Sequence, residues 1–117
     1  MKLSHLIAAG AACLLLSACG SSRKQLYSWY DYQDSSYKYT KEPTDENEAK
    51  LIKTYEKMIA EPKGSRKQVP PGMCAEIGYL YFTKGQKEKA VQFFEKEIEL
   101  YPESALFIKR ILDSVKQ

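Results

Sequence analysis

The first 19 residues determine how much of this chain is left to fold. Lys2 is followed by an apolar run over residues 6–16, and small residues precede Cys19. A charge, a short apolar run and then small residues are typical of a secretory signal that is removed from the mature protein. The run is shorter than the roughly 20 apolar residues that span a bilayer. The pattern therefore predicts that residues 1–18 are a signal peptide and that residues 19–117 fold.

Residues 16–19, Leu-Ser-Ala-Cys, resemble the lipobox of bacterial lipoproteins. In those proteins the peptidase cuts before a cysteine that already carries a diacylglyceryl group. The resemblance implies that Cys19 is the lipid attachment site, and two or three acyl chains make attachment effectively permanent. In the sorting rule of these proteins, Asp after the cysteine retains them in the inner membrane. Gly20 follows here, so we expect the periplasmic face of the outer membrane. The alternatives are an ordinary secretory signal cut after Ala18 and an uncleaved anchor.

The composition of residues 19–117 argues against several classes of function. These residues carry 17 basic and 15 acidic side chains, a balance that gives no signal for nucleic-acid binding. His5 and Cys13 leave with the signal, so Cys74 has no disulfide partner and the mature chain has no histidine. The usual base for a Ser or Cys nucleophile and the usual zinc ligands are then missing. We predict no catalytic residue, no metal and no cofactor.

An enzyme that acts on envelope glycans through paired carboxylates is an alternative. Carboxylates are plentiful in the chain, with 15 Asp and Glu residues. They lie at spacings that are typical of a solvated helix surface, and none forms a recognisable pair.

An aromatic segment follows the short flexible tether predicted for residues 19–26. We expect residues 27–44 to be extended, because Tyr37 and Tyr39 alternate with polar residues. These rings either pack onto the helices behind them or stay exposed as a docking surface. Packing is favoured for most of them, since a chain this small needs the apolar area to fold. The candidates for partner binding are Tyr27, Trp29, Tyr30, Tyr32, Tyr37 and Tyr39.

The periodicity of apolar residues predicts a helical domain over residues 45–117. Thr44 or Asp45 can cap its first helix. A basic loop over residues 62–70 is interpreted as a solvated connector, with contact to anionic groups as the alternative. The predicted helices cover residues 45–61, Pro71 to about residue 83, about Lys87 to residue 101, and about Ser104 to the end.

The middle two helices match the offsets of one tetratricopeptide repeat, a helix-turn-helix of about 34 residues. Small residues suit a close helix crossing, and a glycine permits the left-handed turn. Glu97 departs from the pattern, since a small residue is usual there, and Cys74 is predicted to be a small buried hydrophobe. The matching residues are Ile77, Gly78, Tyr81, Gly85, Ala90, Phe94 and Pro102.

The predicted fold class is all-α. It comprises one divergent tetratricopeptide-like helix pair with a flanking helix on each side, preceded by the extended aromatic segment. The flanking helices are required, because a single repeat cannot bury its own apolar face.

The whole layout is similar to a family of small Gram-negative lipoproteins of unknown function. The resemblance rests on the lipobox, on Tyr-Ser-Trp-Tyr-Asp-Tyr at residues 27–32 and on Lys-Glu-Pro-Thr at residues 41–44. Tyr30 stands where we expect Gly in relatives. Genes of that family often lie beside one for a lipoprotein that resembles the curli secretion channel, which implies a shared outer-membrane assembly. No catalytic residue comes with the resemblance.

We therefore expect a non-enzymatic adaptor or assembly factor that binds another envelope protein and is held to the membrane by acyl chains. The secretion-channel-like lipoprotein is the partner that the resemblance implies. The alternative is a regulator that activates or inhibits a cell-wall enzyme.

Overall fold

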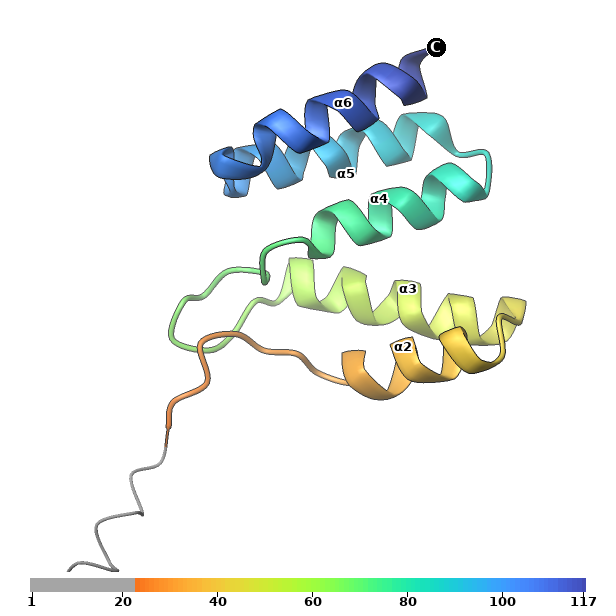
Figure 1. The fold of residues 1–117 in the computed structure, drawn as a ribbon. Coiled ribbons are helices and arrows are strands. Elements are labelled where there is room, and N and C mark those ends of the chain that lie inside the picture. Colours follow the sequence, from red (N-terminus) through yellow and green to blue (C-terminus); the bar gives the residue numbers. More distant parts are fainter. Residues whose placement is uncertain (1–22) are drawn as a thin grey trace, which may run out of the picture.

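The computed structural model describes residues 23–117, so Cys19 and the predicted signal peptide lie outside the described residues. This part of the chain is helical and has no strand, which confirms the predicted class. None of the helices described has the length and apolar character needed to cross a bilayer. In chain order (Figure 1) they are α2 (Tyr32–Lys41), α3 (Asp45–Ala60), α4 (Met73–Thr83), α5 (Lys87–Leu100), the 3-10 helix η2 (Pro102–Ser104) and α6 (Ala105–Lys116).

The helices form a stack in which each one packs against the next along the chain (Figure 1). Helices α2 and α3 make one hairpin, α4 and α5 make a second, and α6 packs on α5. The flanking positions predicted for the first and last helices are thus found, with α3 against α4 and α6 against α5. The least exposed core side chains come from four of the helices: Met58, Cys74, Ile77, Ala90, Phe94 and Ile108.

Local signals in the sequence set several of the helix ends. The Thr44 hydroxyl accepts a hydrogen bond of 3.2 Å from the amide of Asn47, which satisfies one of the free donors at the start of α3. Gly85 has φ +77° in the turn between α4 and α5, as predicted. Helix α4 begins at Met73 and not at Pro71, because Gly72 takes the cap position with φ +89°.

The middle helices cross closely at Gly78. A Cβ at this position would lie 3.2 Å from the carbonyl oxygen of Ala90 and 3.2 Å from the Phe94 ring. Tyr81 and Phe94 are buried in the contact, as expected. The small residues therefore allow the approach that the spacing predicted, while membership of the tetratricopeptide family stays a prediction.

The prediction that residues 27–44 are extended is wrong for most of the segment, because Tyr32–Lys41 forms α2. Tyr32, Ser36 and Tyr39 recur at intervals of four and three residues and lie on one face of this helix. Ser35 is buried against α3, where its small side chain permits close packing. The alternation of Tyr37 and Tyr39 with polar residues therefore did not mark a strand.

Tyr30 lies in the turn that leads into α2 and has φ +46°, a left-handed conformation that favours glycine. This matches the Gly expected at this position in relatives. The conformation is held by a hydrogen bond of 2.5 Å from the Tyr30 hydroxyl to the carbonyl of Glu61. The ammonium of Lys57 also lies 4.6 Å from the centre of the Tyr30 ring.

The end of the predicted tether is fixed to the body of the protein. The amide of Ser65 donates to the carbonyl of Gln25, and the amide of Arg66 donates to that of Leu26, both at 3.0 Å. The interpretation of residues 19–26 as a flexible tether is therefore wrong for these two residues, because backbone pairing with the loop after α3 holds them.

Candidate functional site

A groove of about 600 Å³ runs across one side of the stack, and we call it the binding groove. It is lined mainly by apolar and aromatic side chains from α2, α3, α4 and α6, with Phe94 from α5. Concave, largely apolar surfaces with a few polar groups are the usual form of a binding site. The lining residues are Tyr32, Ser36, Tyr39, Thr40, Leu51, Tyr55, Ala75, Glu76, Tyr79, Leu80, Thr83, Phe94, Phe107 and Ile111.

Two rings in the groove face solvent. Tyr79 on α4 is 59 % exposed and Phe107 on α6 is 65 % exposed. Phe107 belongs to the apolar periodicity of the last helix, yet Ile108, Leu112 and Val115 are the residues that α6 buries. Large exposed rings in a hollow are typical of contact residues, since they bury much area at low entropic cost when a partner covers them.

The carboxylate of Glu76 has a fixed position in the groove. Its Oε2 accepts a hydrogen bond of 2.9 Å from the Tyr32 hydroxyl and another from the Tyr55 hydroxyl. Burial, and then the bond to this carboxylate, raise the pKa of both tyrosines, so the hydroxyls remain donors. A preset carboxylate among apolar side chains can accept a hydrogen bond from a donor group on a partner.

A series of ring contacts leads from the start of the described chain to the groove. The ring centres of Tyr27 and Trp29 lie 6.4 Å apart, and those of Trp29 and Tyr32 lie 5.6 Å apart. The rings of Tyr32 and Tyr55 are also 5.6 Å apart. A neighbouring hollow of about 560 Å³ shares Tyr32 and Ser36 with the groove and includes Trp29.

The six aromatic candidates are therefore distributed unequally. Tyr32 and Tyr39 line the groove, and Trp29, which is 41 % exposed, lies beside it. Tyr37 is 64 % exposed and lines none of the hollows described. Tyr30 also lines the hollow beside the groove and packs partly against the core.

Sequence reasoning missed the groove residues outside the aromatic segment. Tyr79, Glu76 and Phe107 lie on α4 and α6, far from residues 27–44 in sequence, and only the stacking of the helices brings them together. One sequence signal could have indicated the groove: Tyr79 is a large ring that lies beside, and not among, the residues predicted to be buried on its helix.

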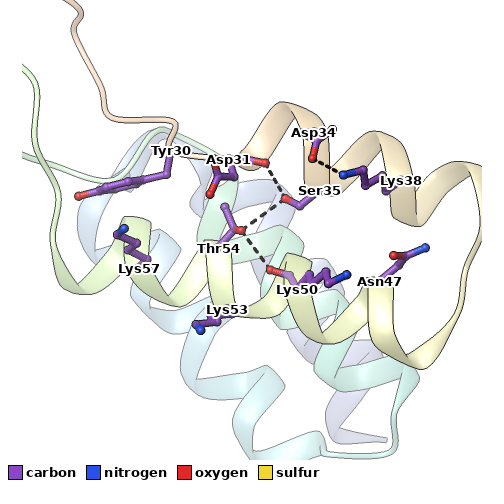
Figure 2. Close-up of a pocket in the computed structure, with 10 residues that line it drawn as sticks. All are labelled: Tyr30, Asp31, Asp34, Ser35, Lys38, Asn47, Lys50, Lys53, Thr54 and Lys57. Carbon is purple, nitrogen blue, oxygen red and sulfur yellow. Dashed lines mark hydrogen bonds and ion pairs between the residues drawn. The ribbon is translucent and has the colours of Figure 1, made fainter.

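A second hollow, of about 380 Å³, lies between α2 and α3 and carries mixed charge (Figure 2). Asp34 and Lys38 form an exposed ion pair of 2.7 Å there, and pairs of this kind contribute little to stability. The hollow is lined by Tyr30, Asp31, Asp34, Ser35, Lys38, Asn47, Lys50, Lys53, Thr54 and Lys57.

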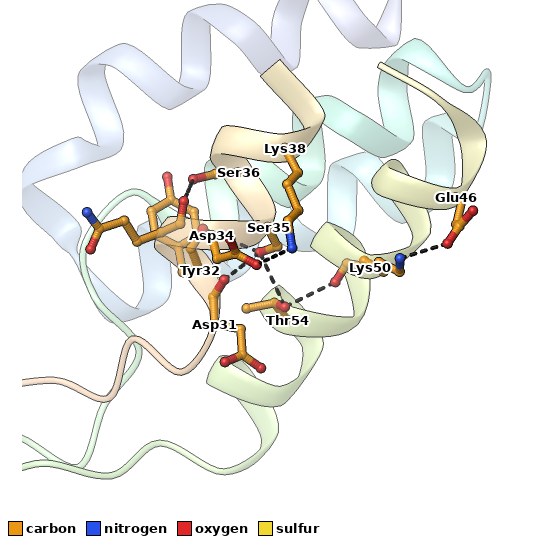
Figure 3. A network of polar contacts seen from close by, with 10 residues as sticks. Asp31, Tyr32, Asp34, Ser35, Ser36, Lys38, Glu46, Lys50 and Thr54 are labelled. Atoms are coloured by element: carbon orange, nitrogen blue, oxygen red, sulfur yellow. Dashed lines mark hydrogen bonds and ion pairs between the residues drawn. The ribbon is translucent and has the colours of Figure 1, made fainter. Parts of the chain in front are cut away.

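The polar groups at the bottom of this hollow bond to one another (Figure 3). The Ser35 hydroxyl lies 2.9 Å from the carbonyl of Asp31 and 3.4 Å from the hydroxyl of Thr54. The Thr54 hydroxyl donates to the carbonyl of Lys50 at 3.0 Å. Because the two buried hydroxyls satisfy each other, this network serves to hold α2 on α3.

Potential metal ligands and the single thiol are the remaining chemical groups of interest in the part of the chain that the structure describes. Residues 23–117 contain no group of three potential metal ligands. Cys74 is fully buried, as predicted, and burial raises the pKa of its thiol to about 12. The thiol therefore stays protonated at neutral pH.

Comparison with known families gives one match. A family model described as "Domain of unknown function (DUF4810)" matches residues 26–111, about three quarters of the chain. Neither the curated proteins nor the solved structures contain a match. The matched residues include the whole aromatic segment and all the lining residues of the binding groove.

Proposed function

The chain belongs to the DUF4810 family, and we propose that it is a lipid-anchored, non-enzymatic adaptor that binds another envelope protein in the binding groove. The observation that carries the proposal is that Tyr79 and Phe107, two exposed rings on separate helices, line the same hollow as the fixed carboxylate of Glu76. A segment of a partner with apolar side chains and one donor group complements this surface.

The lipid anchor is the second part of the proposal. It is supported by the signal-like residues 1–18 and the lipobox that ends at Cys19. The proposed location is the periplasmic face of the outer membrane, with a secretion-channel-like lipoprotein as the partner that the family's gene neighbourhood suggests. Membrane fractionation of Cys19→Ala tests the anchor, and a variant that stays in the membrane pellet would contradict it.

Site-specific photo-crosslinking tests the groove. Benzoylphenylalanine placed at Tyr79 or at Phe107 in living cells is expected to capture the same envelope protein. Tyr37 provides the matched control position, because it is an equally exposed ring that lines none of the described hollows. Capture of the same protein with equal yield at Tyr37 would place the contact outside the groove.

The captured protein then permits a quantitative test. Truncation of a contact ring typically costs more than 1 kcal/mol of binding free energy, so Tyr79→Ser is expected to raise the Kd about tenfold. Tyr37→Ser, the same substitution at similar exposure, is expected to change the Kd less than twofold. If the captured protein is a peptidoglycan enzyme whose rate changes on binding, the chain is a regulator of that enzyme.

A further inference from the structure

One end of the helix stack collects basic side chains around the point where the chain enters the fold. Helices α3 and α4 are joined at this end by residues 61–72, and the turns α2–α3 and α4–α5 lie at the opposite end (Figure 1). We call the exposed cations at the entry end the basic end; they are Arg23, Lys24, Lys63, Arg66 and Lys67.

The five cations have no anionic partner within the described residues. The four ion pairs found in residues 23–117 involve Lys38, Lys50, Lys84 and Lys116, and none of them includes a cation of the basic end. The loop itself contains one acid, Glu61, whose carbonyl binds Tyr30. Three further exposed acids lie at this end of the stack: Asp31 before α2, Glu99 in the last turn of α5 and Glu103 in η2. Because the five cations outnumber these four acids and form no ion pair with them, they leave a positive surplus that is available to an external anion.

The loop that carries three of these cations is held in place. Its backbone pairs with Gln25 and Leu26 at 3.0 Å. At its far end, the Tyr101 hydroxyl donates to the carbonyl of Val69 at 2.6 Å. Gly64 has φ +83° at the crossing, where a Cβ would lie 2.6 Å from the Leu26 carbonyl oxygen. The cations are thus presented by an ordered surface beside the tether.

The tether is short. Five residues lie between Cys19 and Gln25, and even a fully extended chain over these six steps spans at most about 20 Å. An acyl group on Cys19 would therefore keep the basic end, and not the opposite end, next to the lipid headgroups.

We propose that the basic end docks on the anionic phospholipid headgroups of the membrane that holds the anchor. This inference rests on the lipid anchor of the proposed function. Contact at this end directs the helices away from the membrane surface, which leaves the binding groove open to a partner in the periplasm.

Vesicle co-sedimentation tests the proposal without the acyl chains. The protein used is residues 19–117 with Cys19→Ser, since the described core lies between Tyr30 and Val115 and is fully retained. It is expected to bind vesicles of 30 % phosphatidylglycerol in phosphatidylcholine and not vesicles of phosphatidylcholine alone. Absence of binding to the anionic vesicles would overturn the proposal, whether or not Cys19 is acylated in cells.

Two triple variants with the same net charge locate the contact. Lys63→Gln/Arg66→Gln/Lys67→Gln is expected to lower the partition coefficient about 100-fold, because each basic residue near an anionic surface contributes about fivefold. Lys41→Gln/Lys87→Gln/Lys116→Gln, at the opposite end, is expected to lower it less than threefold. If the partition coefficient falls equally in the two variants, net charge alone explains the binding and the proposal is overturned.

Soluble glycerol phosphate separates a headgroup surface from a discrete phosphate site. Glycerol phosphate is added at the same concentration as the anionic headgroups of the vesicles. It is expected to leave the bound fraction of protein unchanged, since a diffuse basic surface interacts with many lipids at once. Full displacement would show a single phosphate site and would contradict surface docking.

Discussion

The carboxylate of Glu97 accepts a hydrogen bond of 2.7 Å from the backbone amide of Gly72, 25 residues earlier in the chain. Gly72 is the cap residue of α4 and has no side chain to offer. Glu97 on α5 therefore supplies both an acceptor and a negative charge to the start of α4, where the helix dipole favours an anion. This explains a buried acid at a position where a small residue is usual in the repeat.

Glu97→Ala is expected to lower the free energy of unfolding by about 2 kcal/mol, because it leaves a half-buried amide without its charged acceptor. Glu97→Gln keeps an acceptor oxygen and loses the charge, so about 1 kcal/mol is expected. Urea unfolding followed by circular dichroism measures both. If the two variants are as stable as the parent, the bond to Gly72 contributes nothing.

Enlarging Gly78 tests the close crossing of α4 and α5. Gly78→Val is expected to cost about 1–3 kcal/mol, because its methyl groups would press on Phe94 and on the backbone at Ala90. Ala49→Val is the control, since Ala49 is exposed on α3 and the substitution adds a β-branched residue to a helix without a clash. Thermal unfolding compares the stability of the two variants. Equal losses of stability would mean that the crossing of α4 and α5 tolerates a larger residue.

The helices of residues 45–117 could be predicted because their signals are local. Thr44 caps α3, Gly85 makes the left-handed turn, and Pro102 stands two residues after the end of α5. Each of these signals acts without a contact from a distant part of the chain. Helix α2 could not be predicted in the same way. Its Ser, Asp and Tyr residues are poor helix formers, and it is stabilised by packing on α3 through Ser35.

Of the 14 residues that line the binding groove, only two were predicted as partner-binding candidates. Tyr32 and Tyr39 stood out as aromatic residues in a polar segment, whereas Phe107 resembled the other apolar residues of its helix and Tyr79 lay beside a predicted buried face. Their exposure depends on which helix lies beside them. The pairing of Gln25 with Ser65 likewise depends on the return of a distant loop, which no local pattern encodes.

Alkaline pH is expected to destabilise the fold through Cys74. Burial raises the pKa of its thiol from 9.0 to about 12, so the unfolded chain loses this proton earlier than the folded one. The contribution of the protonated Cys74 thiol to the free energy of unfolding is therefore complete below pH 9, and it is lost as the pH rises from 9 toward 12. Between pH 8 and pH 10 the loss is about 1 kcal/mol.

Cys74→Ala isolates this effect, because every other group that titrates is common to both proteins. Urea unfolding in reductant at pH 8 and pH 10 is expected to show a smaller alkaline loss in the variant, by about 1 kcal/mol. Parallel losses would indicate that the thiol ionises equally well in the folded state.

Gly64→Ala is expected to break the pairing that holds the tether on the loop. Gly64 and Gly85 have similar left-handed conformations, with φ +83° and φ +77°. They differ in their surroundings, since a Cβ meets the Leu26 carbonyl at 2.6 Å in the first case and nothing within 4 Å in the second. Gly85→Ala therefore costs only the conformational strain, about 1 kcal/mol, and leaves the tether in place.

Hydrogen exchange distinguishes the two alanine variants. In Gly64→Ala the amides of Ser65 and Arg66, which donate to Gln25 and Leu26, are expected to exchange at least tenfold faster while the core amides of α4 keep their protection. In Gly85→Ala all amides are expected to change together, because only global stability falls. Unchanged protection of Ser65 and Arg66 in Gly64→Ala would mean that the tether shifts to accept the methyl group and that its attachment does not depend on glycine.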